Sequence, residues 1–419
     1  MGAEELDDRV IKMPKTNSEL KNNNIKRVFF AIQSSAPIQR KALQEKVGLS
    51  WGNISLNIAT LINLGLVIET AGDGSFVGRK PQTLDINTND HYLIGLDIQV
   101  SVMRAVIVDM KGRVFYQYIR SLAFTDRSSV LVDLYALIDH VLREVDNKHI
   151  VAMGVAVQGI VNRGNTTSVL FPGFSDWEQI DLKRLVEERY GITTFLFHDP
   201  DAIMCAEKLL RNARDPSLRN AALIRLENGV GLSIMINREI FTSMTGKGGE
   251  LGHINVVPDG LPCSCGDRGC LEPYITSGGI IRRFLMERES GAFTTVETQD
   301  IASITFSMLA TAAKQGDPLC TRLFREMGEF LGIGISSYIN IINPQLIIIE
   351  GELTKFKEIF EGDMYRSINK HVWSFNETRV VFADYNPYVA AIGSALASLE
   401  KIVLSAPEFE ALFDNPKTD

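Results

Sequence analysis

The chain has 419 residues, of which 45% are hydrophobic and 22% charged, and its formal net charge is −8. This composition is ordinary for a folded globular protein with two or three domains. Five cysteines are too few for a disulfide framework, so we expect a reducing, cytoplasmic setting. The best candidate for a membrane span, residues 331–349, is interrupted by serine, asparagine and proline, so no membrane partner is expected.

Positive charge is concentrated toward the N-terminus. From Arg9 to Lys80, eleven basic residues stand against four acidic ones, which gives this segment a charge of +7 and the rest of the chain −15. A basic segment on an acidic protein is a frequent footprint of nucleic-acid binding. Ordinary solvated surface can show the same asymmetry, so the charge supports DNA binding only together with a suitable fold.

Residues 16–88 have the pattern of three helices followed by a β-hairpin. After a first segment of helical periodicity, Pro37 opens a short helix that ends at Gly48. Ser50 is a suitable N-cap for a third helix, which closes at Gly65. The two strands that follow flank a Gly-rich loop. This order predicts a winged helix-turn-helix; a small helical protein-interaction module is the alternative.

The third helix of a winged helix-turn-helix enters the major groove of DNA, and side chains near its start reach base edges. The candidate DNA contacts are therefore Ser50, Trp51, Asn53, Ser55 and Asn57 on the outward part of this helix, with Arg79 and Lys80 at the tip of the wing. One head has too little contact area for specific binding. We therefore predict that a homodimer, or a dimer of dimers, binds palindromic operator DNA.

Beyond the head, the pattern changes to alternating strands and helices. A β-β-β-α-β-α order occurs twice, starting near residue 91 and near residue 221. The repetition predicts two related α/β lobes that face a cleft.

A short Gly-rich segment of the second lobe carries one imidazole and three thiols, at His253, Cys263, Cys265 and Cys270. These are the ligand types of a closed tetrahedral zinc site, and Gly266 and Gly269 allow the sharp turns that would bring the thiols together. Four protein ligands leave no position for a reactive water, so the predicted Zn²⁺ is structural. Three free thiols in a surface loop are the alternative.

Residues 91–403 resemble the ROK family (repressor, open reading frame, kinase), which has an actin-like ATPase fold and includes bacterial glucokinases and sugar-responsive repressors. The metal segment, Gly249 to Glu272, carries the most specific signature of the family. With the head included, the whole chain resembles the repressor branch that regulates xylose, glucose or N-acetylglucosamine genes. The implied domains are a polar tail (1–15), the winged head (16–88), a first lobe (89–200) completed by a helix at about 388–403, and a second lobe (201–387) with the zinc loop.

The departures from the family pattern concern the nucleotide. Kinases of the family begin their first lobe with Asp-x-Gly-Gly-Thr, whereas this chain has Gln99 and Val100 at the glycine positions. In the second phosphate loop Glu227 stands where phosphate oxygens would lie, and Glu350 replaces a glycine near the adenosine pocket. Like charges in a closed cleft repel strongly. These positions imply that ATP does not bind and that the chain is not an enzyme.

The sugar side of the family pattern is better kept. The resemblance implies sugar contacts at Gly159, Gly173, His198, Asp199, Glu250, His253 and Glu272. Asp199 matches the general base of the kinases, but its usual asparagine neighbour is His198 here. For Asp199 the alternative is a helix N-cap, and for Glu272 it is an ion pair with Arg268.

Three functions remain in competition. The leading one is a DNA-binding repressor of carbohydrate uptake or catabolism genes, with a monosaccharide effector bound in a degenerate kinase cleft. An ATP-dependent sugar kinase with a fused DNA-binding head is the second. In the third, a partner protein replaces the free sugar as the signal.

Overall fold

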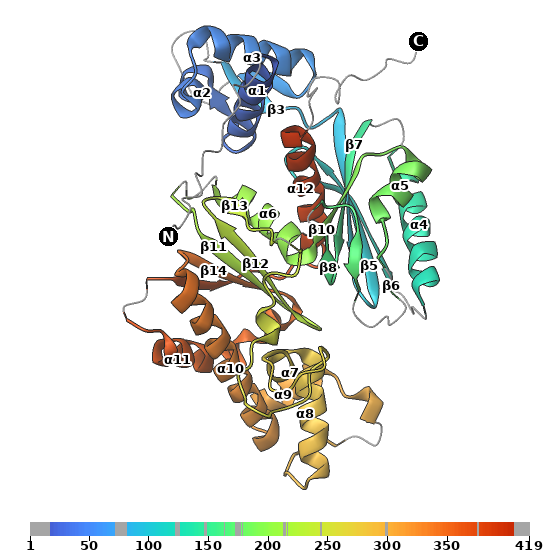
Figure 1. Ribbon diagram of the computed structural model, residues 1–419, viewed down its shortest axis with the longest axis vertical. Coiled ribbons are helices and arrows are strands. Elements are labelled where there is room, and N and C mark those ends of the chain that lie inside the picture. The colour runs from blue at the N-terminus through green and yellow to red at the C-terminus, as the bar shows by residue number, and fades with distance from the viewer. Residues whose placement is uncertain are drawn as a thin grey trace, which may run out of the picture.

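The computed structural model describes residues 17–71, 82–121, 126–145, 149–162, 164–171, 177, 179–212, 215, 217–243, 245–297, 301–374 and 377–405. Two five-stranded sheets form the centres of two lobes, and a small head lies at one end of the molecule (Figure 1). The predicted fold class, a winged head followed by a two-lobed α/β body, is confirmed.

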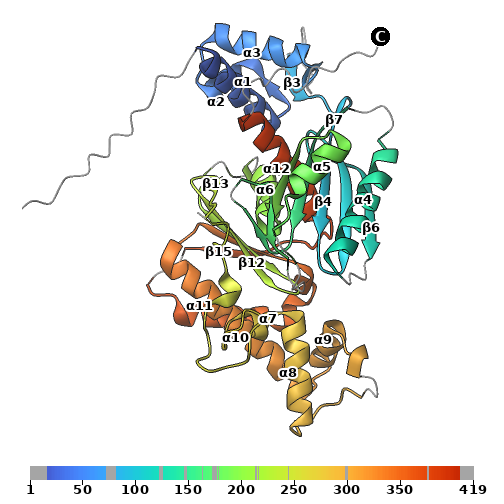
Figure 2. The same ribbon diagram turned by 45° about the vertical axis from the view of Figure 1, so that its right-hand side comes forward.

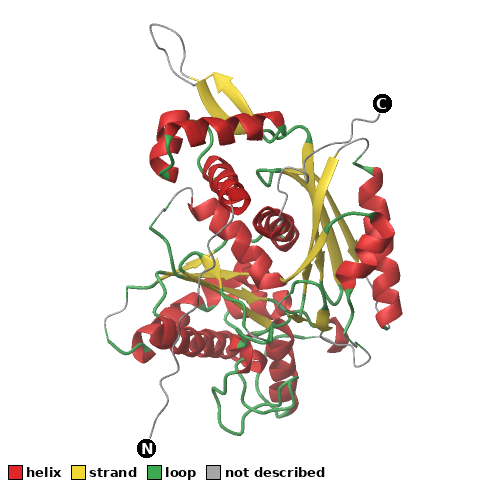
Figure 3. Cartoon of the chain, turned by 45° about the horizontal axis from the view of Figure 1, so that its top comes forward, coloured by secondary structure: helices red, strands yellow, loops and turns green. Residues whose placement is uncertain are grey.

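The head contains three helices and a three-stranded antiparallel sheet of order β1-β3-β2. Its elements are α1 (Asn17–Gln33), β1 (Ile38–Gln39), α2 (Arg40–Val47), α3 (Trp51–Asn63), β2 (Val67–Ala71) and β3 (Gln82–Ile86). Apolar side chains of all three helices are buried together, among them Phe29, Leu43 and Ile58. Figure 3 shows the β2–β3 hairpin projecting from the head.

The start of the second helix differs from the prediction. Instead of beginning at Pro37, α2 begins at Arg40, because Ile38 and Gln39 are extended and pair with Leu84 and Thr83 of β3. This pairing buries Ile38. The predicted N-cap of α3 is confirmed, since the Ser50 side chain accepts a hydrogen bond from the backbone N–H of Asn53.

The first lobe is built on a sheet of order β10-β7-β4-β5-β6. Its strands are β4 (His91–Ile98), β5 (Val102–Asp109), β6 (Val114–Ser121), β7 (His149–Val157) and β10 (Thr194–His198), and a small second sheet joins β8 (Ile160–Val161) to β9 (Ser168–Leu170). Strands β4, β7 and β10 are mutually parallel, so their carboxyl ends lie at one edge. Helices α4 (Arg127–Arg143) and α5 (Leu182–Tyr190) cover the outer face (Figure 1).

The inner face of this sheet lies against α12 (Val389–Ser405). The approach is so close that a Cβ on Gly95 or Gly154 would lie 1.9 Å from a backbone oxygen of α12. Ser394 fastens the contact, because its hydroxyl lies 3.1 Å from the carbonyl oxygens of both Leu96 and Gly154. Helix α6 (Asp199–Asn212) packs beside α12 and also contacts both large sheets, so the boundary expected at residue 200 falls at its start.

The second lobe repeats this plan with a sheet of order β13-β12-β11-β14-β15. Its strands are β11 (Ala221–Leu226), β12 (Val230–Ile236), β13 (Glu239–Ile240), β14 (Leu346–Glu350) and β15 (Arg379–Phe382). One face packs on α6 and α12. The other face is covered by a helical layer made of α7 (Glu272–Ile275), α8 (Ser277–Glu289), α9 (Phe306–Lys314), α10 (Pro318–Ile342) and α11 (Glu361–His371), with 3₁₀ turns at Leu251–His253, Ile301–Ser303 and Glu352–Ile359.

The head and the first lobe share one hydrophobic core. Leu399 and Ile402 of α12 belong to the same buried cluster as Phe29 of α1, and Figure 2 shows the upper end of α12 reaching the head. Polar contacts reinforce the junction: Gln33 donates to the carbonyl oxygen of Met110 at 2.9 Å, and Lys111 pairs with Asp85 at 2.5 Å. Within the described ranges, no helix is long and apolar enough to cross a bilayer.

Candidate functional site

The metal loop brings its four predicted ligands together. The donor atoms of His253, Cys263, Cys265 and Cys270 all lie within 4.8 Å of one another. The Cys265 and Cys270 sulfurs are 3.8 Å apart, and His253 Nδ1 is 3.5 Å from the Cys263 sulfur. Around a tetrahedral zinc with usual bond lengths, these edges would be about 3.8 Å and about 3.5 Å. The cluster therefore has the dimensions of a metal site.

Local backbone geometry explains why this loop closes. Gly266 and Gly269 have φ values of +93° and +77°, and a Cβ at Gly269 would lie 1.8 Å from the carbonyl oxygen of Val257. Glycine is therefore required where the loop folds over itself. A hydrogen bond from the backbone of Asp267 lowers the pKa of the Cys265 thiol. This favours the thiolate, which is the form that binds a metal.

Between the lobes, buried charged side chains gather at the carboxyl edges of the parallel strands of the two sheets; this region is called the cleft below. On one side Asp97 is the next-to-last residue of β4 and His198 the last of β10; on the other, Arg225 is the next-to-last residue of β11 and Glu350 the last of β14. Arg225 and Glu350 are directly opposite residues of neighbouring parallel strands. Asp199 follows His198 as the first residue of α6. The topology therefore brings charged side chains from distant segments to one place.

Arg225 joins these charges, and it is a functional residue that the sequence motifs do not predict. Its Nη1 donates to Asp199 Oδ2 at 2.9 Å and its Nη2 to Glu227 Oε1 at 3.2 Å. The position was visible in the sequence as the single charged residue in the otherwise apolar strand Ala221–Leu226. The expected general base, Asp199, is therefore bonded to a buried guanidinium, with His198 Nε2 3.5 Å from its other oxygen.

Burial shifts the pKa values of the groups around Arg225. Desolvation raises the pKa of Glu350 to about 7 against the opposing effect of Arg225, and it also raises the pKa of Asp97. Burial alone would lower the pKa of Arg225, but Glu227, Asp199, Asp97 and Glu350 together raise it. The guanidinium is thus a permanent charge in the cleft.

The structure places the remaining sugar-site candidates in two groups. Glu250 immediately precedes the 3₁₀ turn that ends at His253, and the Glu272 carboxylate accepts a hydrogen bond from Ser264 at 2.9 Å. A Cβ at Gly252 would touch the Glu272 side chain, so this turn and the start of α7 are in contact. No Glu272–Arg268 ion pair is present among the described residues. Gly159 lies across the cleft with φ +102°, and Gly173 lies outside the described residues.

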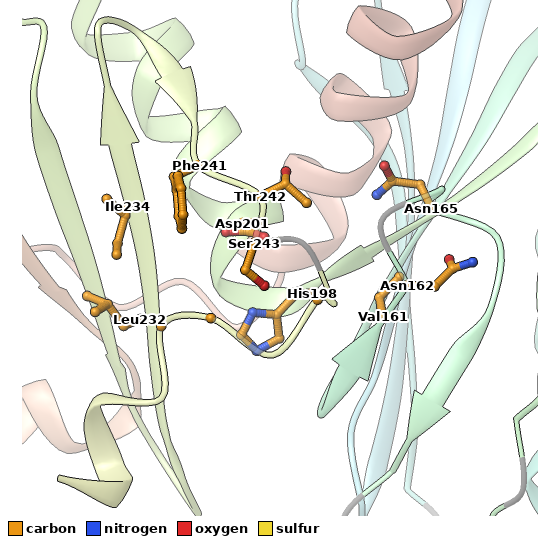
Figure 4. Close-up of a pocket in the computed structure, with 13 residues that line it drawn as sticks. Val161, Asn162, Asn165, His198, Asp201, Leu232, Ile234, Phe241, Thr242 and Ser243 are labelled. Carbon is orange, nitrogen blue, oxygen red and sulfur yellow. The ribbon is translucent and has the colours of Figure 1, made fainter. Parts of the chain in front are cut away.

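A polar pocket adjoins His198 and opens between the lobes (Figure 4). Its hollow measures about 500 Å³ together with its open mouth. Asp201 accepts a hydrogen bond from Ser233 at 2.6 Å, and burial raises the pKa of Asp201. The lobes nearly touch here, since a Cβ at Gly246 would lie 2.2 Å from the carbonyl oxygen of Val161. The pocket lining is Val161, Asn162, Asn165, His198, Asp201, Leu232, Ile234, Phe241, Thr242, Ser243, Gly246, Gly248 and Gly249.

The candidate DNA face of α3 is partly as predicted. Trp51 and Asn53 are exposed, as is Ser50 before them, and Ser55 is half-buried. The prediction that Asn57 faces outward is wrong. Asn57 is only 5% exposed, and its amide donates to the carbonyl oxygen of Asn53 at 2.7 Å. At 3.6 residues per turn, Asn57 falls on the same face as the buried residues of the helix. Arg79 and Lys80 lie outside the described residues.

Comparison with known proteins identifies the family. The ROK family profile matches residues 93–400. The chain belongs to the ROK family. It is 25% identical over 360 residues to the xylose repressor of Bacillus subtilis (strain 168), covering 85% of this chain and 88% of that relative. It is 26% identical over 402 residues to the DNA-binding transcriptional dual regulator NagC of Escherichia coli (strain K12), covering 94% and 97%.

Solved ROK structures share the fold. A ROK family transcriptional regulator described as a homolog of the E. coli MLC protein has a TM-score of 0.80 at 23% identity, covering 94% of this chain and 98% of its own. A ROK family glucokinase from Streptomyces griseus in complex with glucose and AMPPNP has a TM-score of 0.62 at 22% identity, covering 74% and 99%. The first likeness includes the head as well as the body.

Proposed function

We propose that this ROK chain is a sugar-responsive transcriptional repressor that binds operator DNA through its winged head. The observation that carries the proposal is the head itself, a winged helix-turn-helix joined to the body by a shared core. A relative named as a xylose repressor and one named as a DNA-binding transcriptional dual regulator are similar to it over 85% and 94% of its length. The match to the glucokinase covers 99% of the glucokinase chain but only 74% of this one. About a quarter of this chain, enough for the head, therefore has no counterpart in the glucokinase.

The residues of the cleft support the hypothesis that this chain is a degenerate kinase, which does not transfer phosphate. Gln99, in place of a phosphate-loop glycine, is buried and donates to Asp97 at 2.7 Å. Glu227 lines the second loop and Arg225 is bonded to Asp199. A phosphate that approached these positions would be repelled by the carboxylates that lie there. A coupled assay with ATP and a panel of hexoses and pentoses should remain at background; turnover approaching about one per second would favour the alternative, a sugar kinase with a DNA-binding head.

We assign the metal cluster to one structural Zn²⁺, held by His253, Cys263, Cys265 and Cys270. Its four donors and their spacing fit a closed site, in which the metal supplies structural rigidity and leaves no position for a reactive water. Zinc bound there would hold the loop between Glu250 and Glu272, two of the proposed sugar contacts. A reducing cytoplasm would keep the thiols available for the metal.

The proposed effector is a monosaccharide bound between the lobes. Its contacts would come from Gly159, Gly173, His198, Asp199, Glu250, His253 and Glu272. Carboxylates and imidazoles suit paired hydrogen bonds to vicinal hydroxyls. Because His198 replaces the asparagine that usually precedes the base, we do not assume that the sugar is glucose. A thermal-shift screen of monosaccharides tests this, because a ligand of the folded state raises its melting temperature. If only a protein partner, and no sugar, changed DNA binding, the third function would replace this one.

On DNA, we propose that two heads of a homodimer, or of a dimer of dimers, bind the halves of a palindrome. Ser50, Trp51, Asn53 and Ser55 would face the major groove, with Arg79 and Lys80 of the wing on phosphates. The exposed start of α3 supports this assignment for the helix. Selection of bound duplexes from a random pool, followed by footprinting, would reveal the half-sites. Protection of one isolated half-site by a monomer would contradict the symmetric arrangement.

A further inference from the structure

The cleft contains an arginine that the family resemblance does not explain. The side chain of Arg225 is 5% exposed and is bonded to Asp199 and Glu227. Its Nε lies 3.8 Å from Glu350 Oε2, an ion-pair distance but too long for a hydrogen bond. Three carboxylates thus surround one guanidinium. Two of them, Glu227 and Glu350, come from its own lobe, and Asp199 comes from the start of α6.

A fourth carboxylate faces the group from the first lobe. Asp97 is fully buried, accepts hydrogen bonds from Gln99 at 2.7 Å and Arg104 at 3.0 Å, and is stabilised in its charged form by Arg225. The cleft therefore holds four carboxylates and two guanidinium groups. Without Arg225, Arg104 would be the one guanidinium among the described residues left beside these four carboxyl groups.

Even with Arg225 present, the carboxylate of Glu350 is incompletely paired. Both of its carboxylate oxygens are buried without a hydrogen-bond partner among the described residues. A buried charge that lacks a partner is strongly destabilising, whereas a paired one is close to neutral. Removing Arg225 would therefore leave these buried carboxylates without the cation that they share.

We propose that Arg225 is the built-in cation of the cleft: a positioning residue that ties together carboxylates of the two lobes and fixes Asp199 as a hydrogen-bond acceptor for an effector hydroxyl. It carries out the electrostatic role that phosphoryl-transfer sites give to a divalent metal ion. With Oδ2 of Asp199 bonded to Arg225, Oδ1 is left on the side of His198, where the sugar would lie. The part that concerns the effector rests on the proposed function; the part that concerns the cation does not.

If Arg225 is the cation of the cleft, a divalent metal ion should be able to take the place of its guanidinium. If Arg225 is replaced by methionine in the full-length chain, the four carboxylates become a site for an oxygen-preferring divalent ion such as Ca²⁺. We expect the melting temperature of Arg225→Met to fall by roughly 10 °C without calcium. Millimolar CaCl₂, compared with NaCl of the same ionic strength, should restore at least half of the loss. The wild type should not respond to calcium.

Two further variants separate the electrostatic role from simple packing. Arg283→Met removes another buried arginine, which pairs with Glu287 and Glu326 outside the cleft, and should lose stability without any rescue by calcium. Arg225→Met combined with Glu350→Gln removes one of the competing charges and should weaken the calcium response. An Arg225→Met protein as stable as the wild type, or one whose loss calcium does not reverse, would overturn the proposal.

Should Arg225→Met fail to fold, Arg225→Lys and Glu350→Gln decide the question. Lysine keeps the positive charge of arginine but not its several N–H donors in fixed directions. Arg225→Lys should therefore fold, and its melting temperature should fall less than half as far as that of Arg225→Ala, which has no charge. Glu350→Gln should raise the melting temperature at pH 8. A lysine variant no better than alanine, together with a Glu350→Gln protein that melts lower at pH 8, would rule out the cation role.

The effector part has its own measurement. The largest sugar-induced rise in melting temperature seen for the wild type should shrink at least fivefold in Arg225→Lys, because Asp199 is no longer held in one orientation. An unchanged sugar response in Arg225→Lys would overturn the positioning of Asp199. If no sugar shifts the wild type at all, the proposed function fails, while the calcium measurements still test the cation.

Discussion

The metal loop and the cleft both concentrate groups that repel one another, but they are assembled in opposite ways. The metal loop takes all its ligands from residues 253–270 and brings them together through tight local turns. The cleft collects Asp97, Asp199, Arg225 and Glu350 from strands and helix starts that only the tertiary fold makes neighbours. The difference teaches that a local site depends on backbone geometry, whereas a non-local site depends on the packing of both lobes.

The largest effect should come from the metal loop. Cys265→Ala removes one of four ligands, so we expect loss of the zinc and a fall in melting temperature of roughly 10 °C or more. The sugar response should disappear too, since Glu250 and Glu272 flank the loop. Metal content by elemental analysis and thermal unfolding provide the measurements. Cys205→Ala, a cysteine on α6 outside the cluster, is the matched control. Full sugar affinity in metal-free protein would break the link between loop and cleft.

The stability of the cleft should depend on pH through Glu350. The pKa of Glu350 is about 7 in the folded protein against an ordinary 4.5. The folded state therefore binds this proton more tightly, and stability falls as pH rises from about 4.5 to 7. Relative to Glu350→Gln, the wild type should lose on the order of 3 kcal/mol across this window. Chemical denaturation at pH 5 and pH 8 measures the difference; parallel profiles for the two proteins would contradict it.

A smaller effect tests the DNA face, where two asparagines four residues apart have opposite environments. Asn53 is exposed, so Asn53→Ala should cost about 1–3 kcal/mol on the operator and relax one base preference. Asn57 is buried, so Asn57→Ala should lower the stability of the head and weaken operator and scrambled DNA alike. Lys80→Ala should weaken both DNAs and reduce the salt slope by about one counterion. Equal losses on both DNAs for Asn53→Ala would assign it a positioning role.

The smallest effect concerns the start of α3. Ser50 accepts a hydrogen bond at 3.4 Å from the backbone N–H of Asn53, a long bond for a cap. Ser50→Ala should therefore destabilise the head by about 0.5–1 kcal/mol, the low end for loss of a cap. Denaturant unfolding measures this, with Ser55→Ala as the control. A loss above about 2 kcal/mol would mean that Ser50 has a further partner.

The sequence predicted what depends on neighbouring residues. The ligand spacing around Cys263, the cap at Ser50 and the winged order of elements were all visible as local patterns. The prediction for Asn57 is wrong because a polar side chain is not always exposed, and the position of Asn57 in the helical turn is on the buried face. Arg225 was missed because nothing in its own strand shows that Asp199 and Glu350 will surround it. Charge pairing across lobes becomes visible only when the sheets are placed.

The junction between the head and α12 has a consequence for how such proteins can be divided. Val108, Leu399 and Ile402 are buried in the core that also contains Phe29 of the head. Cutting the chain between head and body would expose hydrophobic surface on both fragments, and we expect the body fragment to aggregate. A relative without a head would expose the matching surface of its last helix to water. We therefore expect polar residues at its positions that match Leu399 and Ile402. The final turns of that helix would then distinguish, from sequence alone, ROK proteins that carry a head from those that do not.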